Sequence, residues 1–266
     1  MRREDGSSHV VRTSKKTRFV RLAHEEPVHV DLAALGDTPA LIDLFLSTSS
    51  VIDALDLAPL AKHPALASLT ATIARAPDLT PLASTKLTSL SLTLDGKGTL
   101  DFRPLHGHPT LENVALGFIG TQKKLDLSFL RELPALTTLT IDGGDWKTLD
   151  LSPLEGLPLR SVTLVHQYIK KVDLALLAQP ALEELTLADL EIRERFFSLF
   201  PLARCTKLRS LSLEGAEIGM LDVSALANKK TLRVFTSSNG SLTMMPSAAP
   251  ILAPGLKRWA AHIGIE

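Results

Sequence analysis

Aromatic residues and cysteine are scarce in this chain, and each shortage restricts its class. Aromatics make up 5% of the 266 residues although 45% are hydrophobic, so the core has to be built from Leu, Ala, Val and Ile. The single cysteine, Cys205, cannot form an internal disulfide framework, which agrees with a reducing compartment. We expect Cys205 to be a half-buried structural thiol.

Long apolar runs and an excess of one charge are also lacking. No stretch of about 18 apolar residues is present to span a bilayer, and the N-terminal residues 1–5 are not those of a signal peptide. Lys plus Arg and Asp plus Glu number 29 each, so no global field attracts nucleic acid or an anionic membrane. We therefore expect a soluble, cytoplasmic protein without a membrane partner. Its Ala-, Leu-, Pro- and Arg-rich composition favours a bacterial source.

One short sequence motif, which we call the phrase, recurs along most of the chain. Residues 30–35 read Val-Asp-Leu-Ala-Ala-Leu, and related phrases begin at residues 55, 100, 125, 149, 172 and 221. Each phrase is followed by a Leu-x-x-Leu-x-Leu segment, most clearly at residues 87–92, 136–141 and 208–213. These segments begin about 21 to 26 residues apart in roughly ten copies, which is the spacing of leucine-rich repeats.

The physical reading of one repeat is a short strand followed by a turn. Alternation across Leu-x-Leu points two apolar side chains inward and the intervening residue outward. A single repeat cannot cover its own apolar side, so neighbouring repeats have to stack in order to complete the core.

These segments, together with the Asp-Leu-Ser-Pro-Leu phrase at residues 150–154, resemble those of bacterial short-repeat, internalin-like leucine-rich repeat proteins. The resemblance covers residues 30–262. It implies an α/β fold: a curved leucine-rich repeat solenoid with a parallel β-sheet on the concave face and tight turns, 3-10 or short helical segments on the convex side. The family's asparagine position is occupied here by other residues, among them Ala74, Gly144 and Leu190, so the loops have to satisfy their backbone groups differently.

The repeats divide the chain into a leucine-rich repeat domain at residues 30–266 and an extension at residues 1–29. Within the extension, residues 10–12 and 18–22 flank a polar stretch, which predicts a β-hairpin. Solenoids need caps over their terminal apolar layers. The hairpin is therefore either such a cap or a separate binding arm.

The motifs that would carry chemistry are incomplete. The pattern from His24 to His29 resembles the zinc-protease motif His-Glu-x-x-His, but its spacing is one residue too long and Pro27 would break the helix. His63 and His108 share one repeat position, which predicts histidines in surface turns. We expect no catalytic residue, no cofactor and no metal, and therefore no enzyme.

The outward positions of the strands form the first candidate binding surface. They carry mostly Ser and Thr, and the resemblance implies that a partner binds this concave face. Among the nearby acids are Asp142, Glu184 and Glu214, and His166 is the histidine that could face them. We call this surface the floor and define it by nine residues: Asn113, Thr138, Thr140, Ser161, Thr163, Glu184, Thr186, Ser210 and Ser212.

The second candidate is the edge where the strands run into the following loops. A basic row with interleaved aromatics can bind an acidic protein surface or a nucleic-acid backbone. The alternatives are a row of solvated loop charges and, for Trp146, a place in the core, because it shares the repeat position of Ile169 and Ile192. This loop edge comprises Phe118, Lys123, Lys124, Trp146, Lys147, Tyr168, Lys170, Lys171, Arg193 and Arg195.

The sequence therefore predicts a non-enzymatic protein-interaction module that binds a partner protein by the floor or the loop edge. The alternative functions are polyanion or nucleic-acid binding through the loop edge, and an inhibitor or immunity-type role against a bacterial effector. The chain is expected to be a monomer or to associate end to end.

Overall fold

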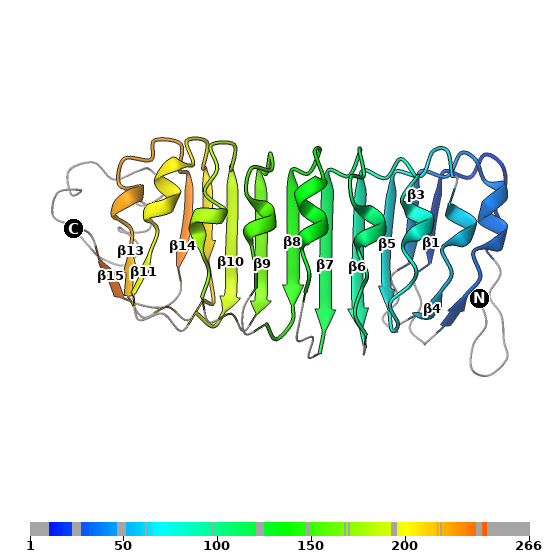
Figure 1. The fold of residues 1–266 in the computed structure, drawn as a ribbon, viewed down its shortest axis with the longest axis horizontal. Helices are drawn as coiled ribbons and strands as arrows, with labels where there is room; N and C mark the ends of the chain where they lie inside the picture. Colours follow the sequence, from blue (N-terminus) through cyan, green and yellow to red (C-terminus); the bar gives the residue numbers. More distant parts are fainter. Residues whose placement is uncertain are drawn as a thin grey trace. The chain divides into compact units, whose positions relative to one another are not determined.

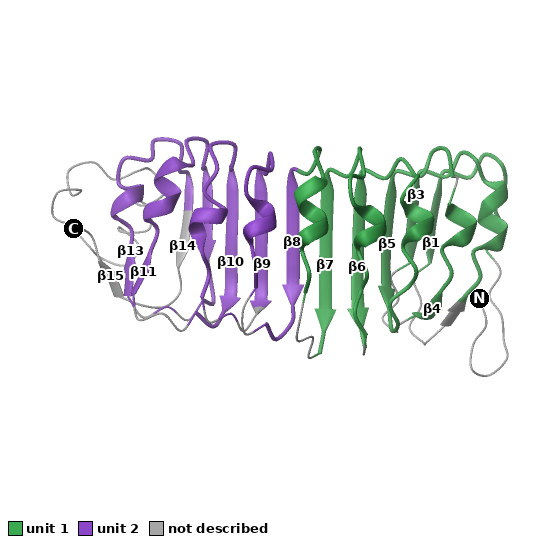
Figure 2. Ribbon diagram, viewed as in Figure 1, with its two compact units in different colours: residues 1–136 green, residues 137–266 purple. Residues whose placement is uncertain are grey.

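In the described part of the chain, each repeat contains one main parallel strand and one short 3-10 helix. The computed structural model describes residues 11–22, 28–46, 52–61, 63–96, 98–120, 125–146, 149–167, 169, 171–192, 196–216, 218, 220–237 and 241–243. Contacts between α-carbons divide the chain into two compact units, unit 1 at residues 1–136 and unit 2 at residues 137–266 (Figure 2).

Unit 1 contains one parallel sheet whose strands follow the order of the sequence (Figure 1). Its main strands are β1 (Phe19–Leu22), β3 (Asp43–Leu46), β5 (Ser68–Ile73), β6 (Ser89–Asp95) and β7 (Asn113–Ile119), and the short strands β2 (Val28–Val30) and β4 (Ile52–Leu55) pair beside them. Its 3-10 helices are η1 (Ala33–Asp37), η2 (Ala58–Leu60), η3 (Thr80–Leu82), η4 (Arg103–Leu105) and η5 (Ser128–Glu132).

Unit 2 repeats this arrangement with a second, smaller sheet. Its main parallel strands are β8 (Thr138–Gly143), β9 (Ser161–Gln167), β10 (Glu184–Leu190), β12 (Ser210–Leu213) and β14 (Val234–Ser237). The smaller parallel sheet contains β11 (Phe196–Ser198), β13 (Met220–Asp222) and β15 (Ser241–Thr243), and the 3-10 helices are η6 (Ser152–Leu154), η7 (Leu174–Leu176), η8 (Phe200–Arg204) and η9 (Ser224–Leu226).

Stacked leucine columns form the core, as the alternation predicts. In unit 2, Leu139 pairs with Val162, which pairs in turn with Leu185, and none of the three is exposed. Burying such a side chain fully contributes about 1.5–3 kcal/mol, before the entropy of ordering it is subtracted. The predicted fold class, a leucine-rich repeat architecture with a parallel sheet and 3-10 turns, is confirmed. No helix among the described segments is long and apolar enough to cross a bilayer.

The aspartate of the recurring phrase caps the turn that follows it. In each case its Oδ1 accepts a hydrogen bond from the backbone N–H two residues later, at 2.9–3.0 Å. This bond satisfies a donor at the start of the 3-10 helix, which is the ordinary use of Asp before a helical turn. The capping residues are Asp31, Asp56, Asp78, Asp101, Asp126, Asp150, Asp173 and Asp222.

The N-terminal strand differs from the predicted hairpin. β1 pairs in parallel with β3, Val20 opposite Leu44, and residues 11–18 form no strand with which it could make a hairpin. The reason is that β1 has the same inward alternation as the repeats, so it extends their sheet. Residues 1–10 and 23–27 lie outside the described part of the chain.

The prediction that His63 and His108 are surface residues is wrong. Their exposed fractions are 4% and 1%, and the turn directs both side chains inward at the position that Thr38 and Thr85 occupy in other repeats. Burial lowers the pKa of His108.

Cys205 shares this repeat position and is fully buried, deeper than the half-buried thiol we expected. Burial raises its pKa, which lowers the fraction of nucleophilic thiolate. In the next repeat the position holds Lys229, whose Nζ donates to the carbonyl oxygens of Ala203 and Cys205 at 2.7 and 2.6 Å. Both residues therefore have structural roles.

Candidate functional site

The floor lies on the outward side of the strands. Eight of its nine residues belong to β8, β9, β10 and β12 of unit 2, and Asn113 belongs to β7 of unit 1. Seven of those eight are half-buried and Glu184 is exposed. Thr140, Thr163, Thr186 and Ser212 stand opposite one another in register, so their hydroxyl groups form one continuous row.

Charged side chains lie along the border of the floor at which its strands begin. The side chain of Glu183 is only 18% exposed and forms two ion pairs. Its Oε1 lies 3.5 Å from Arg160 Nη1, and its Oε2 lies 2.5 Å from Arg209 Nη2. Arg209 also reaches Glu184 at 3.9 Å. Each of the two arginines is more than half exposed, so these ion pairs leave cationic surface available.

A second group of charges lies where the same strands end. His166 at the end of β9 stands between two carboxylates, with Nδ1 2.8 Å from Asp142 Oδ1 and Nε2 3.4 Å from Asp189 Oδ2. The hydrogen bond with Asp142 is the main reason that the pKa of His166 is raised, and the two negative charges add to it. The sequence suggested His166 beside Asp142, but the part played by Asp189 was not foreseen.

This group does not form a metal site. Its carboxylates lie at opposite nitrogens of one ring, so a single cation cannot contact all three side chains. Across the described residues, no group of three or more His, Cys, Asp or Glu has a geometry that would hold a metal ion. The zinc-like pattern from His24 to His29 lies outside the side chains that the structure describes.

Two members of the predicted loop edge are core residues. Phe118 is 7% exposed and Trp146 is 1% exposed, so neither presents its ring to a partner, which corrects the expectation for both. β7 continues past Leu116, so Phe118 points inward like the other alternate residues of its strand. Trp146 shares its repeat position with Ile169 and Ile192, which are also buried, in agreement with a place in the core.

The basic part of the loop edge is barely represented in the described chain. Lys171 is described and exposed. The other members lie outside the described residues: Lys123, Lys124, Lys147, Tyr168, Lys170, Arg193 and Arg195.

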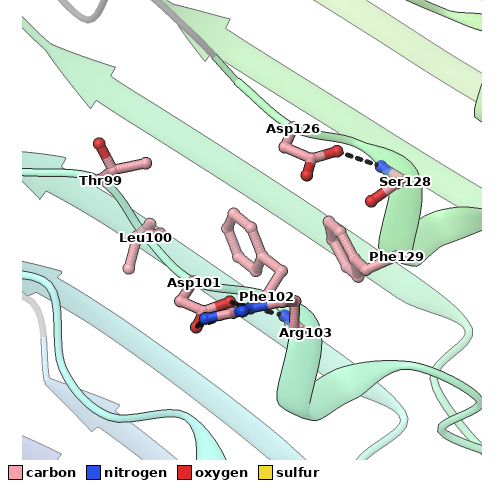
Figure 3. A pocket seen from close by; sticks show the side chains of 8 residues that line it. All are labelled: Thr99, Leu100, Asp101, Phe102, Arg103, Asp126, Ser128 and Phe129. Atoms are coloured by element: carbon pink, nitrogen blue, oxygen red, sulfur yellow. Dashed lines mark hydrogen bonds and ion pairs between the residues drawn. The ribbon is translucent and has the colours of Figure 1, made fainter.

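Unit 1 contains a hollow between two capped turns (Figure 3). The rings of Phe102 and Phe129 stack there with centroids 4.5 Å apart. Arg103 donates to Asp101 from its side chain and its backbone, and these bonds lower the pKa of Asp101 to about 2. Asp126 is likewise engaged by the backbone N–H of Ser128. Because both carboxylates are held by their turns, we assign no ligand to the hollow, whose volume is about 250 Å³.

Comparisons with known proteins bear on the fold alone. No protein-family model matches the sequence, and no curated protein matches it either. An internalin from Listeria monocytogenes matches with a TM-score of 0.57 and 19% identity, covering 88% of this chain and 70% of the internalin chain. A TLR13–ssRNA13 complex matches with a TM-score of 0.52 and 19% identity, covering 86% of this chain but only 40% of the other. This chain therefore has the fold of a leucine-rich repeat protein and resembles the internalins.

Proposed function

We propose that this protein is a non-enzymatic interaction module whose floor, on β8, β9, β10 and β12, binds a partner protein. The observation that carries the proposal is the unbroken outward face of these strands. Small hydroxyl side chains stand in register across four repeats there, between charged groups at both ends of the strands. The likeness in fold to an internalin supports the same kind of role.

The chemistry of the floor determines what it can contribute to binding. Each hydroxyl offers one hydrogen-bond donor and two acceptor lone pairs, and its short side chain loses little entropy when a partner covers it. The charges at the strand ends can fix the orientation of a partner. The floor residues include no Trp, Tyr or Arg, so we expect the partner to supply the large anchoring side chains.

Two further roles remain alternatives. Polyanion binding by the loop edge would be driven by phosphate contacts and would weaken steeply with salt. The TLR13 structure is of a complex with ssRNA13, so this alternative is included in the experiment below. The second is an inhibitor or immunity-type role, in which the partner protein is a bacterial effector.

Site-specific photocrosslinking tests the proposal. A benzophenone amino acid is placed at Thr163 or Thr186 on the floor, and at the exposed Glu155 beside the turn of η6 as the control. We expect one protein to be crosslinked from both floor positions and not from Glu155 when cells of the source organism are irradiated. Equal products from Glu155, or none from the floor, would contradict the proposal. Nucleic acid released by high salt would favour the alternative.

The identified partner then permits a quantitative test. Thr163→Arg places a bulky cation on the floor, and we expect it to weaken binding at least about tenfold, which corresponds to about 1.4 kcal/mol. Glu155→Arg is the matched control and should leave the dissociation constant unchanged. Because Thr163 is half-exposed, the melting temperature of its variant should remain close to that of the wild type.

A further inference from the structure

Four successive strand ends of unit 2 adopt an unusual backbone conformation. Gly143, His166, Asp189 and Gly215 have φ angles of 75°, 54°, 50° and 69°, all in the left-handed region. Glycine takes this conformation without strain, whereas a residue with a Cβ is less stable there by roughly 1–2 kcal/mol. The two middle strands therefore hold side chains at positions where their neighbours have glycine.

The left-handed turn changes where these side chains point. In β7 the residue two places beyond Leu116, Phe118, is buried. His166 and Asp189 lie two places beyond Leu164 and Leu187, yet both are exposed, and after Asp189 the strand returns to an inward residue at Leu190.

The repeat that contains β12 leaves space for the exposed side chain of Asp189. A side chain at Gly215 would collide with the Asp189 carboxylate, so glycine is required at that position. The backbone N–H of Asp189 also donates to the carbonyl oxygen of Glu214 at 2.9 Å. The end of β10, which carries Asp189, thus packs against the residues that follow β12.

Only one protonation state of His166 satisfies both of its contacts. A neutral imidazole has one N–H donor and one nitrogen lone pair, whereas an imidazolium has two donors. Carboxylates are acceptors, and here they face both ring nitrogens. A neutral ring can donate to one of them but has to direct its lone pair at the other.

We propose that Asp142, His166 and Asp189 form a proton-dependent clip that joins the ends of three successive strands of unit 2. With the ring protonated, His166 bridges both carboxylates and stabilises the left-handed ends of β9 and β10. With the ring neutral, one bridge is lost, the carboxylates are no longer neutralised, and these strand ends open more readily.

The direction of the pH dependence follows from the charges around the ring. Among the described residues, the charged groups that face it are Asp142 from β8 and Asp189 from β10. Glu214, just after β12 in the next repeat, is an exposed acidic residue. The hydrogen bond with Asp142, followed by the negative charges of Asp142 and Asp189, raises the pKa of His166 above the value of about 6.5 in an unfolded chain. While both aspartates are ionised, the clip is therefore fully present below about pH 6.5 and is lost as the pH rises through the higher pKa of the folded protein.

An NMR titration of the purified protein tests the clip and needs no partner, so its outcome is independent of the proposed function. The His166 signal is assigned with a His166→Gln variant. We expect His166 to titrate above pH 6.5, and Asp142→Asn and Asp189→Asn each to reduce the upward shift. Asp145→Asn is the matched control: it removes an equal charge from an exposed residue just after β8 and should leave the titration unchanged.

Hydrogen exchange provides the second readout. After correction for intrinsic rates, the amide of Asp189 should be less protected at pH 9 than at pH 6 in the wild type. The His166→Gln variant should lose this dependence on pH. A His166 pKa at or below 6.5, a titration unaffected by Asp189→Asn, or equal protection at both pH values would each overturn the proposal.

Discussion

Replacing Trp146 should destabilise unit 2 more than any loop substitution, because its indole is 1% exposed and is the largest fully buried side chain among the described residues. The ring lies over Gly144, and a side chain added at that glycine would collide with it. Trp146→Ala removes the whole ring from this close packing, which costs about 3–5 kcal/mol in buried sites. Total stabilities are of the order of 5–15 kcal/mol, so the loss is large. In a domain of this size it corresponds to a fall in melting temperature of roughly 6–20 °C.

The matched variant is Trp146→Ile, because Ile169 and Ile192 occupy the same buried column. We expect it to lose no more than about half as much free energy of unfolding, since a branched side chain refills part of the space. Urea denaturation followed by circular dichroism measures both variants. Equal losses in the two, or a loss below about 1 kcal/mol for Trp146→Ala, would refute the assignment of Trp146 to the core.

Two further predictions concern buried and capping groups. Lys229→Met removes the ammonium donor from the carbonyl oxygens of Ala203 and Cys205, although the second keeps a hydrogen bond from the backbone N–H of Leu208. We expect a loss of about 1–3 kcal/mol in the same urea assay, and unchanged stability would mean that the Lys229 bonds contribute nothing. The side-chain and backbone hydrogen bonds from Arg103 lower the pKa of Asp101, and the backbone and side-chain hydrogen bonds from Ser128 lower the pKa of Asp126. The folded pKa values lie below the unfolded value of 3.8, so this stabilisation is present above pH 3.8 and is lost as the pH falls toward about 2. Thermal melts from pH 5 to pH 2 should show a falling midpoint, and a constant midpoint would contradict this contribution.

The alternation of leucines predicted the strands and the stacking of the repeats, and the family resemblance implied that the sheet is parallel. Leu139, Val162 and Leu185 lie opposite one another because each occupies the same place in its repeat, and a repeat fixes its own register. The same alternation could also have placed Phe118 in the core, since it continues the inward series from Val114 and Leu116.

Side-chain direction outside regular alternation was not predictable from the sequence. His63 and His108 lie in turns, where the repeat position says which residues share a column but not which way the column points. The threonines at that position, Thr38 and Thr85, are no guide, because threonine occurs both buried and exposed.

The contact between His166 and Asp189 was not predicted, for a different reason. A strict period of two would turn His166 and Asp189 toward the core, and only their positive φ angles bring them to the surface. A single left-handed residue leaves no mark on a hydrophobicity pattern, unless it is a glycine.

The capping aspartates have a consequence for how such a chain can change in length. Asp150 caps the turn of its own repeat, as Asp126 and Asp173 do, and none depends on a cap from another repeat. A duplicated or deleted segment running from one such aspartate to the next carries its own turn geometry with it. Growth or shortening by whole repeats therefore leaves every remaining turn capped, and only the two newly joined core layers have to be fitted to each other.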